Sequence, residues 1–141
     1  MSEPTIRIIT ALVLIVHGIG HSMALFPALN ISSTENWHHR SWLLSGLLGD
    51  QISRIMVVIL FGVTTIGFIA AGLGLLGWLV PHSAWQTLAL VCAVISLVAL
   101  GLFWNAFVTF FPNKIGAIAV NAATLWALLG SGNLPEMIKN L

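Results

Sequence analysis

The sequence predicts an all-α integral membrane protein, a four-helix bundle that runs up and down across the bilayer. Hydrophobic residues make up 58% of the 141-residue chain, and charged residues only 6%. A soluble domain carries roughly a quarter charged residues, so these few charges cannot cover a surface exposed to water. The apolar residues fall into four long stretches, and two of the three connections between them are short.

The four stretches cover about 5–29, 54–80, 84–111 and 114–134, within a single transmembrane domain that spans 1–141. Each exceeds the roughly 20 residues that a helix needs to cross the hydrocarbon core, and the fourth is the shortest. Prolines mark their limits, because proline continues a helix poorly and suits connections. These prolines are Pro27, Pro81 and Pro112.

The connections predict how the helices are ordered in space. The short turns at Pro81 and Pro112 make consecutive helices antiparallel neighbours, so both termini should lie on one side of the bundle. The one long connection, 30–53, contains an apolar segment, Leu43–Leu48, that is too short to span. We expect this segment to form a short helix in the membrane interface or one that re-enters the bundle.

Charge and cysteine content exclude several classes of function. The net charge is +1, from five Lys or Arg and four Asp or Glu, with no basic block. Binding to nucleic acid therefore has no support. Cys92 is the single cysteine, which leaves no partner for an internal disulfide and too few sulfurs for a thiolate metal site. The predicted partners are the lipid bilayer and other membrane subunits or further copies of the chain.

The strongest sign of chemistry is a histidine pair in the first apolar stretch. His17 and His21 are four residues apart, which places both imidazoles within about 40° of one helix face. An ionisable group at membrane depth is costly and usually faces a protein interior or a cavity. The pair therefore predicts a polar site inside the bundle.

Other polar residues fall in the same half of the predicted bundle. Asn105, beside Trp104, lies about 9 Å inside the end of the third stretch, and Asn121 lies at a similar depth in the fourth. Ser96 falls in the opposite half. We predict a polar pocket near His17 and His21, with Asn105 and Asn121 orienting the imidazoles, Trp104 lining the pocket and the long connection as its roof. Asp50 and Arg54, four residues apart, are expected to form an ion pair within one helix.

Three functional interpretations follow from this pocket. The first is a small membrane subunit of a redox or respiratory-type system that binds a quinone, a haem or a similar hydrophobic cofactor through His17, His21, Asn105, Asn121 and Trp104. The second is a metal site that uses His17 and His21, with His38 or His39 folding back from the loop. The third is a non-catalytic, structural subunit of a larger membrane complex. No catalytic residue is identified, and His38 and His39 suit an interfacial position.

The opening of the chain resembles that of the DoxX-like membrane proteins. The resemblance rests on Arg7, the apolar run after it, His17-Gly18 and His21, and on the glycine-rich end of the second stretch at 72–77. It implies a four-helix bundle in a prokaryotic plasma membrane. Some members of that family are linked to thiosulfate oxidation coupled to quinone reduction, and others to oxidative-stress complexes. The resemblance favours the redox interpretation.

Overall fold

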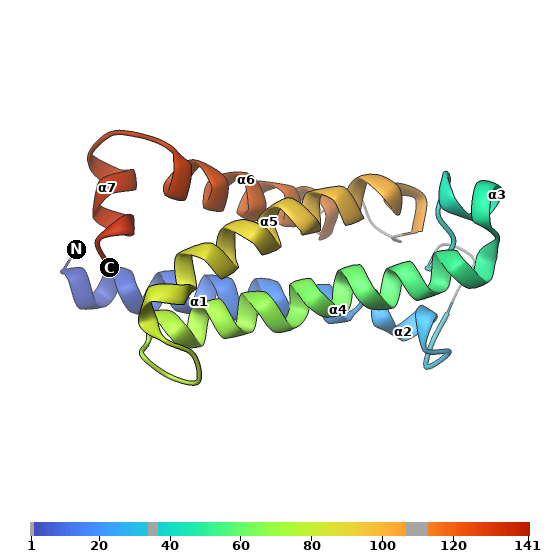
Figure 1. The fold of residues 1–141 in the computed structure, drawn as a ribbon, viewed down its shortest axis with the longest axis horizontal. Helices are drawn as coiled ribbons and strands as arrows, with labels where there is room; N and C mark the ends of the chain where they lie inside the picture. Colours follow the sequence, from blue (N-terminus) through green and yellow to red (C-terminus); the bar gives the residue numbers. More distant parts are fainter. Residues whose placement is uncertain (1, 34–36, 107–112) are drawn as a thin grey trace.

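The chain folds into an all-α bundle in which four main helices run antiparallel to their neighbours (Figure 1). The computed structural model describes residues 2–33, 37–106 and 113–141. The helices are α1 (Glu3–Ser22), α2 (Leu25–Ala28), α3 (Leu44–Leu48), α4 (Asp50–Leu75), α5 (Trp85–Leu102), α6 (Ile115–Leu129) and α7 (Asn133–Lys139), with single 3-10 turns η1 (His82–Ala84) and η2 (Trp104–Ala106).

The order of the helices confirms the predicted up-down bundle. Both ends of the chain lie at the same end of the molecule, where α1 starts and α7 ends (Figure 1). The Arg7 guanidinium donates to the backbone carbonyl of Leu141 there. The short helix α3 confirms the helix expected within Leu43–Leu48, and it precedes α4 at the opposite end of the bundle.

Three of the described helical stretches are long and apolar enough to cross a membrane: Glu3–Ala28, Asp50–Leu75 and His82–Leu102. The length predicted for the fourth helix, 114–134, was wrong. Helix α6 has 15 residues, which is about 22 Å and shorter than a hydrocarbon core of about 30 Å. Helix α6 ends at Leu129 because Gly130 has an extended backbone conformation. Gly132, at a φ of 115°, then redirects the chain into α7.

The predicted bounds of the second and third helices also need correction. Helix α4 begins at Asp50 and ends at Leu75, so 76–80 belong to the turn, in which Gly77 has a φ of 77°. Helix α5 ends at Leu102, nine residues before the predicted end. The predicted turn around Pro112 lies largely outside the described residues, which resume at Asn113.

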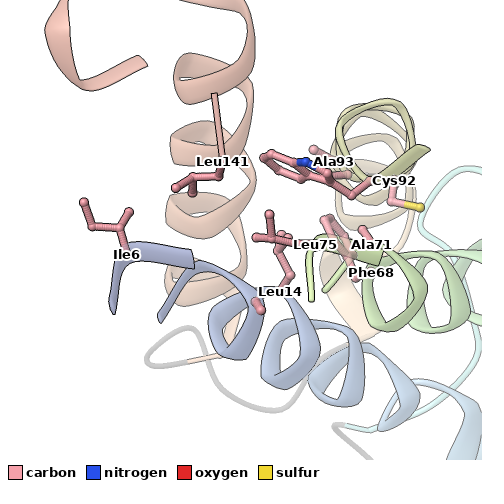
Figure 2. Close-up of a cluster of buried hydrophobic side chains, with 11 residues drawn as sticks. Ile6, Leu14, Phe68, Ala71, Leu75, Cys92, Ala93 and Leu141 are labelled. Carbon is pink, nitrogen blue, oxygen red and sulfur yellow. The ribbon is translucent and has the colours of Figure 1, made fainter. Parts of the chain in front are cut away.

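Two apolar clusters fill the interior, one toward each end of the bundle. The cluster near the chain termini joins α1, α4, α5 and the C-terminal residue (Figure 2). Its largest member that is fully enclosed is Phe68, which also lies against the histidines described below. The second cluster contains Phe61 and Phe103, whose rings meet edge to face at 6.1 Å.

Glycines allow the helix backbones to approach closely, as small residues do in many membrane bundles. A Cβ added at Gly67 of α4 would overlap the Cys92 sulfur of α5. A Cβ added at Gly72 of α4 would lie 2.7 Å from the backbone carbonyl oxygen of Ala11 in α1. The central helix α4 therefore contacts a different neighbour through each of these two glycines.

The contact at Gly67 gives a prediction that a second substitution can reverse. We expect Gly67→Ala to lower the free energy of unfolding by about 1–2 kcal/mol, because the new methyl group overlaps the Cys92 sulfur. Cys92→Ala removes that sulfur and leaves the Cys92 Cβ position 3.8 Å from the new methyl group, an ordinary contact. Thermal unfolding in detergent should show that the double variant regains most of the stability lost by Gly67→Ala. A double variant less stable than either single variant would contradict this packing.

Candidate functional site

A closed ring of polar side chains joins three helices inside the bundle. His17 and His21 come from α1, Ser96 from α5 and Asn121 from α6. The His17 Nε2 atom lies 3.0 Å from Asn121 Oδ1 and 3.2 Å from His21 Nε2. The ring closes through Ser96 Oγ, which is 2.9 Å from His21 Nε2 and 2.7 Å from Asn121 Nδ2.

The donor and acceptor roles in this ring follow from the chemistry of its members. The Asn121 amide oxygen can only accept, so His17 Nε2 carries the proton and donates it. The Asn121 amide donates to Ser96 Oγ, and the Ser96 hydroxyl donates to His21 Nε2. This assignment makes His17 the Nε2–H tautomer and His21 the Nδ1–H tautomer, with both imidazoles neutral. The hydrogen bonds from His17 to Asn121, from Asn121 to Ser96 and from Ser96 to His21 need no added proton. The 3.2 Å contact between the two Nε2 atoms has no proton of its own, because the single Nε2 proton of His17 goes to Asn121.

The ring is enclosed by aromatic packing. His21 is 5% exposed, and Ser96 and Asn121 are fully buried. The Phe68 ring of α4 meets His17 edge to face at 4.7 Å and stacks on His21 at 5.8 Å. Buried polar groups are costly unless they are hydrogen-bonded, so the ring fixes the mutual positions of α1, α5 and α6.

The two histidines also line a cavity of about 780 Å³. Its walls come mainly from α1 and α6, a pair of main helices that are not in extensive contact with each other. The small residues Gly116 and Ala117 of α6 and the residues Val13 and Val16 of α1 are part of its lining. Most of the lining is apolar. The remaining lining residues are Leu12, Gly20, Met23, Ala24, Trp37, Phe61, Leu100, Asn113, Lys114 and Val120.

The structure brings together three of the five residues predicted for the site. His17, His21 and Asn121 meet as expected, whereas Asn105 and Trp104 lie beyond the end of α5. Asn105 Oδ1 accepts from the Trp42 backbone amide at 2.9 Å, and both predicted residues line a separate hollow of about 320 Å³. The structure adds two residues that sequence reasoning missed. Ser96 completes the polar ring, and Lys114 lines the main cavity.

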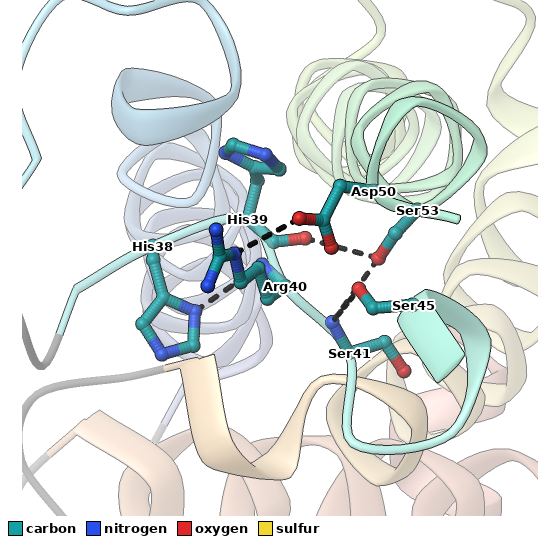
Figure 3. Close-up of polar contacts among 7 residues, drawn as sticks. All are labelled: His38, His39, Arg40, Ser41, Ser45, Asp50 and Ser53. Carbon is teal, nitrogen blue, oxygen red and sulfur yellow. Dashed lines mark hydrogen bonds and ion pairs between the residues drawn. The ribbon is translucent and has the colours of Figure 1, made fainter.

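The long connection ends in its own polar cluster at the start of α4 (Figure 3). Asp50 pairs with Arg40 at 3.1 Å, so the predicted Asp50–Arg54 ion pair was wrong. The Arg54 guanidinium instead donates to the Ala28 carbonyl, which ties α4 to α2. The Ser53 hydroxyl donates to the His39 carbonyl at 3.1 Å. These contacts hold the loop against the bundle.

His38 in this connection accepts a hydrogen bond from the Arg40 backbone amide through Nδ1 at 3.2 Å. Partial burial, with Arg40 and His39 close by, lowers the pKa of His38 below its ordinary value. Among the described residues, no group of three or more His, Cys, Asp or Glu is arranged to hold a metal ion. The third metal ligand that the metal interpretation requires is therefore not supplied by this part of the chain.

Haem ligation meets a similar obstacle in the polar ring. Both Nε2 atoms are hydrogen-bonded within it, so an iron bound at either one would have to displace protein partners. Comparison of the chain with protein-family models, curated proteins and solved structures finds no match. The arrangement of the site is therefore what carries the functional argument.

Proposed function

We propose that the chain is a small integral membrane protein of a redox or respiratory-type system that binds a quinone-like molecule in the cavity between α1 and α6. One observation carries the proposal: two imidazoles line a cavity whose other walls are mostly apolar. Small-molecule sites are mostly apolar, measure about 300–1,000 Å³ and contain a few polar groups that orient the ligand. The resemblance to DoxX-like proteins points the same way, since some of those proteins are linked to quinone reduction.

The free edges of the imidazoles suit a quinone. The hydrogen bonds of both rings to the described residues go through Nε2, which leaves Nδ1 of each ring for a ligand. His21 then offers an Nδ1–H donor for a quinone carbonyl, and His17 offers an Nδ1 acceptor for a quinol hydroxyl. A quinone needs no displacement of the ring, whereas a haem iron bound at Nε2 does.

A structural role is the second candidate, and one observation favours it. The side chains of His17, His21, Ser96 and Asn121 are hydrogen-bonded to one another without any ligand, as expected of residues that hold helices together. In that case the chain is an accessory subunit that packs into a larger membrane complex or against further copies of itself.

Ligand titration separates the two candidates. We expect decylubiquinone to quench the tryptophan fluorescence of the purified protein saturably, at one molecule per chain, because Trp37 lines the cavity. His21→Gln should weaken this binding roughly tenfold, the loss expected for one good polar contact to a ligand. The matched control is His82→Gln, because His82 lies at the opposite end of the bundle and bonds the Gly74 carbonyl.

The absorption spectrum before and after dithionite completes the test. We expect no Soret band in the protein as purified. A Soret band that sharpens on reduction would replace the quinone proposal with haem binding. Wild-type protein that shows no saturable quenching, combined with a large loss of stability in His21→Gln, would leave the structural role.

A further inference from the structure

Lys114 is a buried cation in the same cavity, and the quinone proposal makes no use of it. Its side chain lines the cavity at the start of α6, and the residue is only 9% exposed. Its ammonium lies 5.0 Å from the centre of the Trp104 ring. A cation over an aromatic face gains less stability from the ring than burial of its charge costs.

The described acidic side chains are all paired elsewhere. Glu3 pairs with Arg7, Asp50 with Arg40 and Glu136 with Lys139. No described carboxylate lies within ion-pair distance of Lys114. A buried ammonium calls for an anion close to it, and the described residues supply none.

The shape of the cavity restricts what this anion is attached to. Lys114 lies at the loop end of the cavity with Trp37 and Met23, and the α1 wall continues from there to Leu12. Met23, directly after the end of α1, is eleven positions beyond Leu12, which corresponds to about 16 Å along a helix. Val13 and Val16 line this wall, and both are exposed in the folded chain. The cavity thus has a cationic end and an apolar length.

We propose that this cavity binds a single-chain anionic amphipath, a long-chain carboxylate whose head group pairs with Lys114. The apolar chain then lies along the α1 wall past Val16 and Val13. One chain suits a cavity of about 780 Å³ and about 16 Å in length. This site goes beyond the proposed function, because it depends on Lys114 and the apolar wall and not on the Nδ1 atoms of the histidines.

Brominated fatty acids test the proposal, because bromine quenches nearby tryptophan and Trp37 lines the cavity. In neutral detergent, we expect 9,10-dibromostearate to quench wild-type fluorescence at a mole fraction roughly tenfold lower than its uncharged methyl ester. Lys114→Met should abolish this preference, and Lys114→Arg should keep it. The control Lys139→Met should also keep it, because Lys139 bonds Glu136 and the Gly130 carbonyl at the far end of the bundle.

Three outcomes would overturn the proposal. Equal quenching of wild type by the acid and the ester would show that the site does not select charge. A preference for the acid that survives in Lys114→Met would place the anion elsewhere. In nanodiscs, a brominated phosphatidylglycerol that quenches more strongly than brominated phosphatidylcholine would point to a two-chain lipid. If Lys114→Met fails to fold, Lys114→Arg and the wild-type comparison still decide. If the protein binds decylubiquinone but does not prefer the brominated acid over its ester, the carboxylate site is overturned and the quinone proposal stands.

Discussion

Asn121→Leu is expected to lower the free energy of unfolding by about 2–4 kcal/mol. The substitution removes two hydrogen bonds at once and leaves the His17 Nε2–H and the Ser96 hydroxyl without their amide partner. Each unsatisfied buried group costs about 1–3 kcal/mol, although polar contacts inside membrane bundles average about 0.6 kcal/mol. The fully buried position argues for the larger value. Unfolding in graded sodium dodecyl sulfate measures the loss.

Thr124→Val is the matched control on the same helix. The Thr124 hydroxyl donates only within α6, to the Val120 carbonyl at 2.8 Å, so its removal breaks no contact between helices. We expect a change below about 0.5 kcal/mol, as for most substitutions away from such networks. Equal losses in the two variants would mean that the polar ring does not hold α6 in place.

Gly72→Ala is expected to cost about 2–3 kcal/mol and to loosen the packing of α1 on α4. A methyl group at this position would lie 2.6 Å from the Ile15 side chain and 2.7 Å from the Ala11 carbonyl oxygen. Backbone cannot move aside as a side chain can, so the loss should approach the upper end for overpacked sites. The melting temperature in detergent measures it.

Gly62→Ala provides the comparison, since Gly62 belongs to the same helix and no atom lies within 4 Å of its added Cβ. Alanine forms helix better than glycine, so this variant should gain up to about 1 kcal/mol. A Gly72→Ala variant that matched Gly62→Ala in stability would show that α1 and α4 do not approach as closely as described.

The fold was predictable because its signals are local and strong. Apolar runs long enough to span, separated by prolines, predict helices and antiparallel neighbours, and the i, i+4 spacing places His17 and His21 on one face. Asn121 was correctly placed beside the histidines because its depth in the membrane could be counted from the nearby turn at Pro112. These features need no knowledge of how the side chains pack.

The wrong placements of Ser96 and Asn105 share one cause, the length assigned to the third helix. The apolar sequence continues to Phe111, so periodicity alone extended the helix there, whereas α5 ends at Leu102. With the true end, Ser96 lies about 9 Å inside the helix and reaches His21, and Asn105 falls outside it. Lys114 was missed for a different reason. A lysine beside a turn suggests a solvated charge, and its burial depends on contacts with distant segments.

Filling the cavity is the most direct test that it binds a ligand. Gly116 of α6 lines the cavity and has open space around an added Cβ, so Gly116→Phe should occupy the cavity without touching the polar ring. We predict that this variant keeps the wild-type melting temperature within a few degrees and loses saturable quenching by decylubiquinone. A stable Gly116→Phe variant that binds decylubiquinone as tightly as wild type would contradict ligand binding between α1 and α6.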